Sequence, residues 1–386
     1  MNKLYRFRKN GNRFIQVQFR HLPGKWMSTG TNDRDEAVRF AERFLSNTGC
    51  TPAKSMTFRE FATVFFSPED PRGYRHWNLK HGKKYQDDHY VQQQAFLDNY
   101  LIPKFGDYLI DSITDVMIDD FIVDLVGVNG HELADNTKNK VLTAMRVILY
   151  EAKRMKLVST NVASDVMQIT ETHNARKPFT GTELRLMFPN DDKKLLDIWR
   201  TPMWACYFLV MRDTGFRPGE VAGLMRSNYI PALHGVYTKQ SVHGSTRTLQ
   251  KRIKTTDSGF KYKTGVLTSQ TERLLQEYMS TLEGDFLFLR LGKLLRTEVS
   301  NKHLKASITR AGVSLDGRTQ YSLRHSFETD LTGHVEDKVL LELMAHTQYH
   351  TEYDHRTPEM ILRELQPVRQ LLEQRNTSSE RPLEAK

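Results

Sequence analysis

Disulfide-rich secreted proteins and membrane proteins are both disfavoured by what this sequence of 386 residues lacks. Its 2 cysteines, Cys50 and Cys206, lie far apart and supply neither a disulfide framework nor the spacing of a zinc site. The longest apolar run, MWACYFLVM at 203–211, is far too short to span a bilayer. The N-terminus is basic without an apolar core, unlike a secretory signal. These features predict a cytoplasmic protein with no membrane segment.

Acidic residues are missing from the first part of the chain, where none precedes Asp33. The basic residues of this stretch are Lys3, Arg6, Arg8, Lys9, Arg13, Arg20 and Lys25. The whole chain carries a net charge of +10 and has a pI of about 9.4. Such a balance favours a polyanionic partner, either nucleic acid or an anionic membrane surface.

Residues 1–48 have the pattern of a small β-rich domain. RFIQVQF at 13–19 alternates apolar and polar side chains between two turn signals, which is typical of a half-buried strand. TNDRDEAVRFAERFL then predicts a helix that begins at the cap residues Asn32 and Asp33. We expect a three-stranded sheet and one helix. The basic polar face of that sheet fits a DNA-binding surface and an ordinary solvated face equally well.

The segment 56–168, which follows a linker at 46–55, has the pattern of an all-helical domain. Thr57 and Glu60 form a capping box that opens its first helix. The basic, aromatic-rich stretch RGYRHWNLKHGKKY at 72–85 is interpreted as a long loop. Further helical periodicity is found at 86–102, from Thr114 onward and at 136–155.

The segment 178–366 has a mixed pattern, and ETHNARKPFT at 171–180 marks its boundary. Helical stretches flank a central region, 229–268, that shows the alternation of strands. The last helix starts at Thr357 with proline next, and its end and tail occupy 367–386. Its apolar positions, 361, 365, 368 and 372, fit packing on its own domain and docking on a neighbouring copy equally well.

DTGFRPGEVAGL at 213–224 contains the first candidate site residues. Pro218 disfavours the α conformation for Arg217 and suits the first turn of a helix. Arg217 is therefore expected at a helix N-terminus, where its guanidinium and the helix dipole could act on one anion. Glu220, at the third helical position, can reach back to Arg217 or its backbone. The ordinary alternative is a surface arginine in an ion pair.

A second arginine lies near a predicted helix start in YSLRHSF at 321–327. Ser322 is a candidate N-cap, which would place Arg324 and His325 in the first helical turn. Together with Arg217, Arg324 could hold one tetrahedral anion such as a phosphate.

Two further polar side chains are candidates. RIKTTDSGFKYKTGVLT at 252–268 predicts a hairpin with its turn at 257–259. Lys254, near the end of the first strand, could act as a mobile general acid, or it could be an ordinary solvated lysine. LLELMAHT at 340–347 predicts an amphipathic helix that ends at His346.

AHTQYHTEYDH at 345–355 combines Tyr349 and Tyr353 with several histidines. A nucleophilic tyrosine, a metal site and an unremarkable surface loop are the three interpretations. Metal binding is disfavoured because no cysteine lies nearby and a helix is unlikely through this segment. Its candidate ligands would be His346, His350 and His355.

The order and spacing of TGFRPGE, a hairpin lysine, YSLRHSF, LMAHT and EYDH resemble the tyrosine recombinases, the integrases of phages and mobile elements. LIPKFGDYLIDSIT and NTKNKVLTAMRVILYEAKRM are similar to the helical core-binding domain of that family. The resemblance covers most of 1–366. It implies a multidomain α+β protein: an arm-type DNA-binding domain at 1–48, a helical core-site domain at 56–168 and a catalytic domain at 178–366 that is mainly helical with a small antiparallel sheet.

The resemblance also implies the chemistry. In this family a tyrosine attacks a DNA phosphodiester and forms a 3′-phosphotyrosine link, so that rejoining requires neither ATP nor metal nor another cofactor. Arg217 and Arg324 would hold the non-bridging oxygens, and Lys254 would protonate the leaving 5′-oxygen. His346 would bind the same phosphate, and Glu220 would orient the assembly.

This chain departs from the family pattern at two positions. Tyr321 stands where the family usually has histidine, and a phenol can donate a hydrogen bond but is a poor proton acceptor at neutral pH. The usual position of the nucleophile, nine residues beyond His346, is occupied here by His355. Tyr353 is favoured over Tyr349 as the nucleophile because a histidine follows it two residues later, as in the family, although the loop is then shorter by two residues.

The expected partner is double-stranded DNA with core and arm-type sites. We expect the protein to be a monomer without DNA and to form a homotetramer on DNA. A DNA-bending accessory protein or an excision factor stays open as a further partner. Binding should depend strongly on salt. The expected DNA-contacting residues are Arg6, Arg8, Lys9, Arg13, Arg20, Arg75, Lys83, Lys84, Lys138 and Lys140.

The predicted function is site-specific recombination through a Holliday junction, in a bacterial or phage-encoded protein. One alternative is a type IB topoisomerase, which shares the catalytic chemistry but has no arm-binding module. Another is a DNA-binding accessory protein with impaired catalysis, which the tyrosine at 321 and the short loop would favour.

Overall fold

The computed structural model describes residues 5–9, 11–19, 24–47, 56–70, 73–83, 85, 87–171, 177–244, 246–251, 262–345 and 356–377. The chain divides into two compact units, Met1–His173 and Asn174–Lys386. Among the residues described, no helix combines the length and the apolar character needed to cross a membrane.

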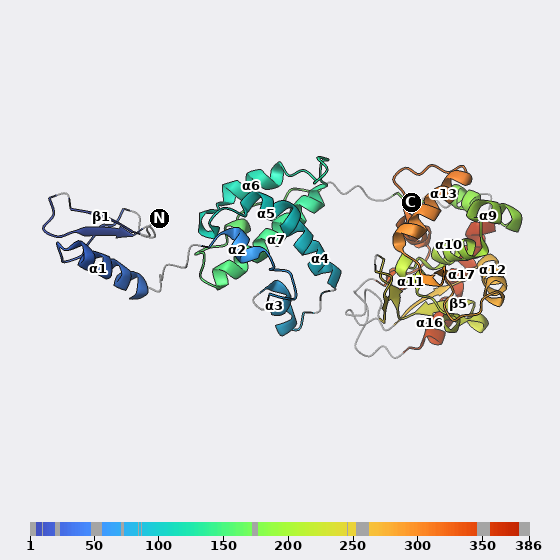
Figure 1. Ribbon diagram of the computed structural model, residues 1–386. Helices are drawn as coiled ribbons and strands as arrows, with labels where there is room; N and C mark the ends of the chain where they lie inside the picture. The colour runs from blue at the N-terminus through green and yellow to red at the C-terminus, as the bar shows by residue number, and fades with distance from the viewer. Residues whose placement is uncertain are drawn as a thin grey trace. The chain divides into compact units, whose positions relative to one another are not determined.

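The N-terminal part of the first unit is a small antiparallel sheet covered by one helix (Figure 1). Val17 and Phe19 of β2 pack with Ala41 of the helix, whereas Arg6 and Arg8 of β1, on the other face of the sheet, are exposed. This confirms the predicted three strands and one helix. The elements are β1 (Tyr5–Arg8), β2 (Gln16–Phe19), β3 (Met27–Ser28) and α1 (Arg34–Asn47).

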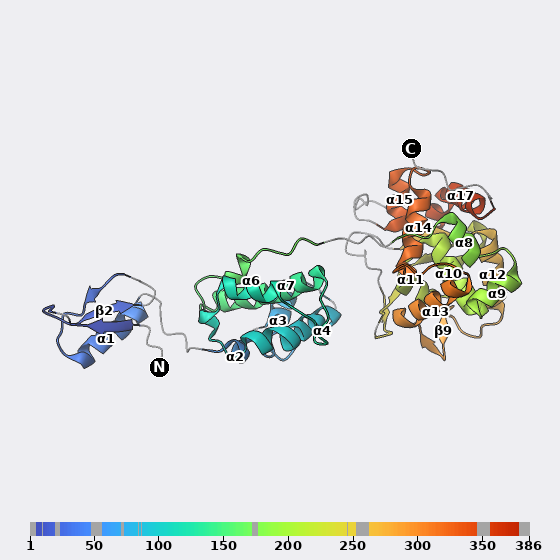
Figure 2. The same ribbon diagram turned by 90° about the horizontal axis from the view of Figure 1, so that it is seen from above.

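The rest of the first unit is helical, as predicted. The capping box is present, because Glu60 N donates to Thr57 Oγ1 at 3.2 Å and Thr57 N donates to Glu60 Oε2 at 2.8 Å. The long helix α7 buries Leu142, Met145 and Leu149 on one side, and α6 lies beside it (Figure 2). The helices are α2 (Phe58–Ala62), α4 (Asp87–Phe96), α5 (Ile102–Phe105), α6 (Asp115–Val123) and α7 (Asp135–Arg154), with a π-helical turn at Leu97–Leu101 and 3₁₀ turns at Ile110–Ser112 and Val162–Ser164.

The prediction of a long loop at 72–85 is wrong, because this stretch contains the helix α3 (Tyr74–Lys80). Tyr74 packs edge-on against Phe66, with their ring centroids 5.9 Å apart, and Asn78 is fully buried. The helix is therefore stabilised by contacts with the rest of the domain rather than by its own residue pattern.

The second unit is built around the buried helix α10 (Pro202–Thr214), which packs against α12 and α14 (Figure 2). Its apolar side chains form the core of the unit together with Phe188, Trp199 and Phe288. The other helices before the C-terminal end are α8 (Gly181–Met187), α9 (Asp192–Trp199), α11 (Pro218–Ala222), α12 (Ser269–Ser280), α13 (Thr297–Arg310), α14 (Gln320–Leu331) and α15 (Asp337–Met344), with 3₁₀ turns at Arg226–Asn228 and Pro231–Leu233.

The strands of the second unit fall mainly in the predicted region 229–268. β8 pairs with β5, so that Lys263 lies opposite Thr238, whereas β7 pairs with β6. The hairpin turn predicted at 257–259 lies outside the described residues. The strands are β4 (Tyr229–Ile230), β5 (Gly235–Thr238), β6 (Ser241–Val242), β7 (Leu249–Gln250), β8 (Lys263–Val266), β9 (Leu289–Arg290) and β10 (Lys293–Leu294), and the first sheet has the order β4-β5-β8.

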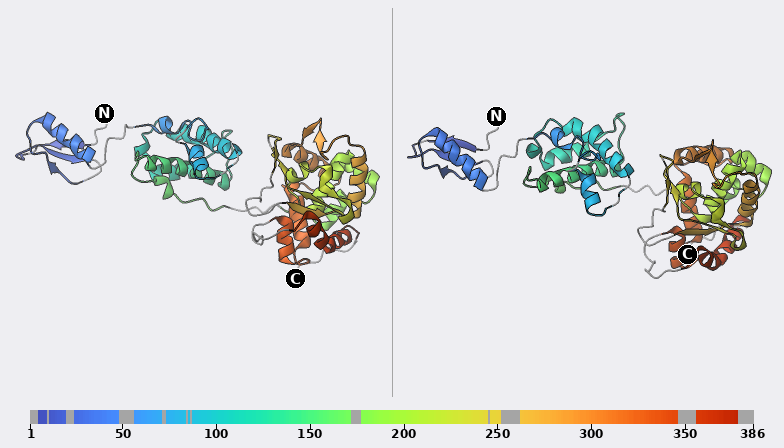
Figure 3. Two further views of the ribbon diagram at one scale, coloured as in Figure 1. Left: turned by 90° about the horizontal axis from the view of Figure 1, so that it is seen from below. Right: turned by 60° about the horizontal axis from the view of Figure 1, so that its bottom comes forward.

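The C-terminal helices pack on their own unit (Figure 3). Thr357 caps α16 (Pro358–Glu364) as predicted, and α17 (Gln366–Thr377) follows it. The apolar side chains of Ile361, Leu365, Val368 and Leu372 are buried beside Val266 and Phe327. Of the two placements that the sequence left open, this chain shows packing on its own domain.

Candidate active site

A tight turn between α10 and α11 carries Arg217. Gly215 ends α10 with φ +60°, and a Cβ atom at this position would lie 2.4 Å from Cδ1 of Phe327. Arg217 is extended, with φ −68° and ψ 152°, as expected before proline. Helix α11 has only 5 residues, so its dipole adds little to the field that was expected at Arg217.

Glu220, in α11, stabilises the turn that carries Arg217. Its Oε2 accepts from the backbone N–H of Arg217 at 2.7 Å, and its Oε1 accepts from Arg217 Nη1 at 2.9 Å. The carboxylate side chain is only 2% exposed. Both the backbone and the guanidinium of Arg217 are therefore fixed by one buried carboxylate.

Arg324 joins the same turn from α14. Its Nη1 donates to the carbonyl oxygen of Gly215 at 2.6 Å, and its Nη2 donates to the carbonyl oxygen of Met344. Arg324 is 6% exposed. Because Met344 is the last residue of α15, this guanidinium connects the Arg217 turn to the helix that precedes His346.

Lys263, in the buried strand β8, completes the cluster from behind. Its Nζ donates to the Gly215 carbonyl oxygen at 3.2 Å and to Glu220 Oε2 at 3.2 Å. The ammonium also lies 4.8 Å from the centroid of the Phe216 ring. Glu220 is thus shared between two cations.

The cluster contains three basic side chains and one carboxylate, and their pKa values reflect this. Burial alone would raise the pKa of Glu220, but the charges of Lys263 and Arg217 lower it to about 2. Burial and the nearby charge of Arg217 lower the pKa of Arg324 to about 10. Burial also lowers the pKa of Lys263, although Glu220 opposes this effect. The excess of positive charge makes this a favourable place for an anion.

Tyr321 lies at the second position of α14, three residues before Arg324 on the same helix. The helix begins at Gln320 with Thr319 as its N-cap, so the prediction of Ser322 as the N-cap is wrong. Ser322 instead accepts a hydrogen bond from the backbone N–H of Thr319 at 3.3 Å. The reason is that the chain enters the helix earlier than the apolar pattern indicated.

Several predicted site residues lie outside the described residues and remain predictions. In the proposed catalytic set these are Lys254, His346 and Tyr353. The alternative nucleophile Tyr349, the candidate metal ligands His350 and His355, and the DNA-contacting candidates Arg20 and Lys84 also belong to this group.

The polar face of the N-terminal sheet brings Arg6 and Arg8 together. Arg6 Nε donates to Gln18 Oε1 at 2.8 Å, and Arg8 Nε donates to Gln16 Oε1 at 3.2 Å. The Arg8 and Arg6 guanidinium carbons lie 4.0 Å and 5.3 Å from the centroid of the Trp26 ring. We call these five side chains the Arg-Trp face. Lys9 and Arg13 are exposed.

The four described basic candidates of the helical domain differ in environment. Lys138 is buried, and its Nζ donates to the carbonyl oxygen of Val123 at 2.6 Å near the end of α6. Arg75 pairs with Asp87 at 2.8 Å. Lys140 and Lys83 are exposed. Lys138 therefore has a structural role that its sequence position did not indicate, and we leave it out of the proposed DNA surface.

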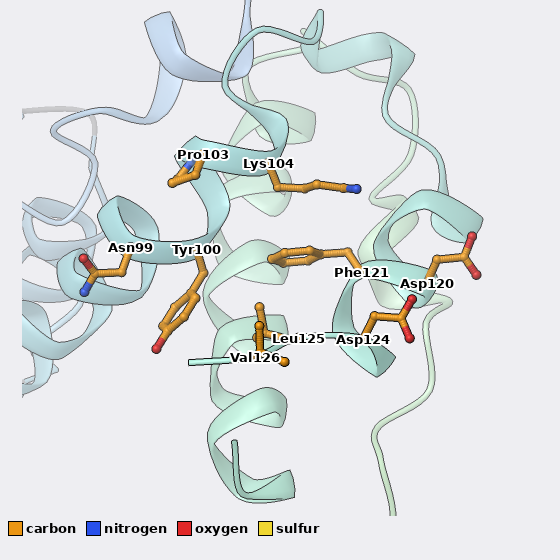
Figure 4. Close-up of a pocket in the computed structure, with 9 residues that line it drawn as sticks. All are labelled: Asn99, Tyr100, Pro103, Lys104, Asp120, Phe121, Asp124, Leu125 and Val126. Atoms are coloured by element: carbon orange, nitrogen blue, oxygen red, sulfur yellow. The ribbon is translucent and has the colours of Figure 1, made fainter. Parts of the chain in front are cut away.

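A groove of about 450 Å³ in the helical domain lies between α6 on one side and α5 with the π-helical turn Leu97–Leu101 on the other (Figure 4). Tyr100, Phe121 and Leu125 supply apolar surface, whereas Asp120 and Asp124 border it with carboxylates. Carboxylates repel a phosphate backbone, so this groove does not extend the basic surface.

Comparison with solved structures identifies the class of fold. An integrase of the transposon Tn1549, in complex with transposon right end DNA, is 15% identical, with a TM-score of 0.59 over 79% of this chain and 98% of that chain. A lambda integrase from a tetramer bound to a Holliday junction is 12% identical, with a TM-score of 0.55 over 92% of this chain and 95% of that chain. At these identities the likeness establishes that the chain has the fold of DNA integrases.

A family model matches part of the sequence. Residues 179–358 match the phage integrase family, and this match includes Arg217, Glu220 and Arg324. This segment of the chain is therefore similar to the phage integrase family. A search of curated proteins gave no match.

Two buried side chains near the turn were missed by sequence reasoning. Besides Lys263, Asp213 accepts from Arg212 Nε at 2.7 Å and from the backbone N–H of Thr268 at 2.9 Å, which ties the end of α10 to α12. A lysine in a short strand and an Arg-Asp pair at a helix end are both common on solvated surfaces. No signal in a single sequence distinguishes these buried examples.

Proposed function

We propose that this chain is a site-specific DNA recombinase that cuts and rejoins DNA through a covalent tyrosine intermediate. The observation that carries the proposal is the contact of Arg324 with the Gly215 carbonyl oxygen, in the turn that carries Arg217, together with the contacts by which Glu220 fixes Arg217. Two guanidinium groups held by neighbouring contacts suit a single phosphodiester, whose charge increases in the transition state.

The proposed reaction is a transesterification. The phenol oxygen of Tyr353 forms a bond to phosphorus, while the bond from phosphorus to the 5′-oxygen breaks. Lys254 donates a proton to that leaving oxygen, and His346 donates a hydrogen bond to a non-bridging oxygen. Rejoining is the same reaction in reverse with a 5′-hydroxyl as the nucleophile, so the phosphotyrosine conserves the bond energy and no cofactor is required.

Tyr321 has a limited part in this proposal. Its phenol can donate a hydrogen bond to the phosphate beside Arg324, but it does not accept a proton readily at neutral pH. The proton of the attacking tyrosine must then pass to another group or to water. This substitution favours a slow enzyme, and it is the observation that supports the alternative of an impaired DNA-binding accessory protein.

DNA binding would use separate basic surfaces. The Arg-Trp face suits an arm-type site, because two arginines held over one ring concentrate positive charge on the polar face of the sheet. Lys140 and Lys83 on the helical domain suit the phosphate backbone of a core site. We propose that four copies act on two paired sites and that strands exchange through a Holliday junction.

Covalent trapping tests the proposal. Wild-type protein is incubated with a nicked half-site from the end of the element that carries the gene, and the products are separated on a denaturing gel. A protein–DNA adduct is expected. Specific binding in a gel shift without an adduct would favour the impaired accessory protein, and relaxation of supercoiled plasmid without a specific site would favour a type IB topoisomerase.

A further inference from the structure

Lys263 is buried where few lysines are found. Its side chain is 0% exposed, and its ammonium lies between the Gly215 carbonyl oxygen and the Glu220 carboxylate. A charged group in such a place costs free energy unless it is paired and hydrogen-bonded, and this one is both. The cost suggests that the charge serves the site rather than the fold alone.

The packing of β8 delivers Lys263 to this position. Gly265 lies against Thr214, the last residue of α10, and a Cβ atom on Gly265 would be 2.7 Å from Thr214 Cβ. This close approach of strand and helix places Lys263 directly behind the turn that carries Arg217. Because the ammonium is enclosed, it does not reach a bound DNA strand and is not a candidate for the proton donor.

The contacts of Lys263 coincide with those that position the two arginines. The Gly215 carbonyl oxygen accepts from both Lys263 Nζ and Arg324 Nη1. Glu220 Oε2 accepts from both Lys263 Nζ and the backbone N–H of Arg217. One ammonium group therefore touches one acceptor of Arg217 and one acceptor of Arg324.

We propose that Lys263 is a positioning residue for DNA cleavage: from β8 it holds the Glu220 carboxylate and the Gly215 carbonyl group so that Arg217 and Arg324 bind the same phosphate. The inference rests on the proposed recombinase function. Sharing Glu220 between Lys263 and Arg217 also leaves the Arg217 charge less fully neutralised, and so more available to the phosphate.

The test compares wild type, Lys263→Met, Glu220→Gln and the double variant on the nicked half-site. Single-turnover cleavage rates, gel-shift affinities and thermal unfolding are measured for each protein. Lys193→Met, on the exposed side of α9, is the matched control. The double variant removes both charges together, so it keeps the test usable if Lys263→Met alone folds poorly.

We expect Lys263→Met to slow cleavage by about 10- to 100-fold, the usual effect of losing a group that orients others, with DNA affinity unchanged within about 3-fold. The loss in the double variant should be close to that of Glu220→Gln alone, because Lys263 acts through Glu220. The control variant Lys193→Met should cleave the half-site at the wild-type rate.

A pH profile separates positioning from simple structural support. Without Lys263, burial raises the pKa of Glu220, so cleavage by Lys263→Met should weaken in mild acid more than cleavage by wild type. This added acid sensitivity should vanish in the double variant. Equal wild-type and Lys263→Met rates and profiles, or fully additive losses, would overturn the inference, whereas absence of a wild-type adduct would overturn the recombinase function itself.

Discussion

Arg324 donates a hydrogen bond of 2.6 Å from Nη1 to the carbonyl oxygen of Gly215, two residues before Arg217. This contact makes the position of one arginine depend on the turn that carries the other. The conformation of that turn depends on Gly215, Glu220 and Lys263. The two guanidinium groups are thus held by one connected set of buried contacts, and each part of that set can be tested separately.

Replacing Gly215 with alanine should destabilise the protein by about 3 kcal/mol, because the left-handed backbone and the overlap with Phe327 both cost free energy. Gly317→Ala is the matched control, since Gly317 has φ +70° and a Cβ atom added there would meet nothing within 4 Å. It should cost about 1 kcal/mol. Urea unfolding of both variants measures the difference, and equal costs would show that Phe327 yields to the new methyl group.

Replacing Arg217 or Arg324 with lysine should lower the cleavage rate by about 100- to 1,000-fold, because an ammonium keeps the charge but loses the planar pair of donors. Affinity for the half-site should change little, since many other phosphate contacts contribute to binding. Rates come from single-turnover adduct formation. Arg273→Lys, at an exposed pair with Asp192, serves as the control and should retain the wild-type rate.

The stability supplied by Glu220 should depend on pH. Its pKa in the folded protein is about 2, below the ordinary value of 4.5, so its ionised form stabilises the fold above pH 4.5 and this stabilisation is lost as the pH falls toward 2. The difference in Tm between wild type and Glu220→Gln should therefore be constant from about pH 7 to about pH 5 and shrink at lower pH. A difference that persists undiminished in strong acid would contradict this assignment.

Arg6→Ala and Arg8→Ala should each weaken DNA binding and reduce the slope of log affinity against log salt by about 1, as expected for loss of one phosphate contact. Arg39→Ala, at an exposed position of α1, provides a comparison outside the Arg-Trp face. Fluorescence anisotropy over a salt series measures the slope. If all three variants had the same slope, the Arg-Trp face would not be a DNA-binding surface.

Lys138 and Lys140 should separate stability from DNA binding. Lys138→Met leaves the Val123 carbonyl group without its buried donor, so it should destabilise the helical domain by about 1–3 kcal/mol. Lys140→Met should leave stability unchanged and reduce the salt slope. Thermal unfolding and anisotropy on the same two proteins give both quantities, and reversal of the two effects would refute the assignment.

Local sequence signals predicted the local features well. The capping box of Thr57 and Glu60, the start of α16 at Pro358 and the contact between Glu220 and Arg217 each depend on residues only a few positions apart. Such contacts require no knowledge of the fold. The family resemblance allowed prediction for the longer segment 179–358, because the resemblance depends on the order of short motifs.

Long-range packing accounts for what the sequence did not predict. Helix α3 forms at 74–80 because its aromatic side chains pack on the rest of the helical domain. Lys263 and Lys138 are both buried by partners far away in the chain, although lysine is ordinarily a surface residue. In each case the deciding contact joins segments whose proximity a single sequence does not reveal.

Locating the tyrosine that becomes linked to DNA tests the proposed recombinase mechanism most directly. Wild type, Tyr353→Phe and Tyr349→Phe are incubated with the nicked half-site, and the adduct is digested so that mass spectrometry locates the modified residue. We predict a DNA-linked peptide modified at Tyr353 and loss of the adduct in Tyr353→Phe alone. An adduct that survives in Tyr353→Phe and disappears in Tyr349→Phe would contradict the proposed position of the nucleophile, and an adduct on neither tyrosine would contradict the mechanism.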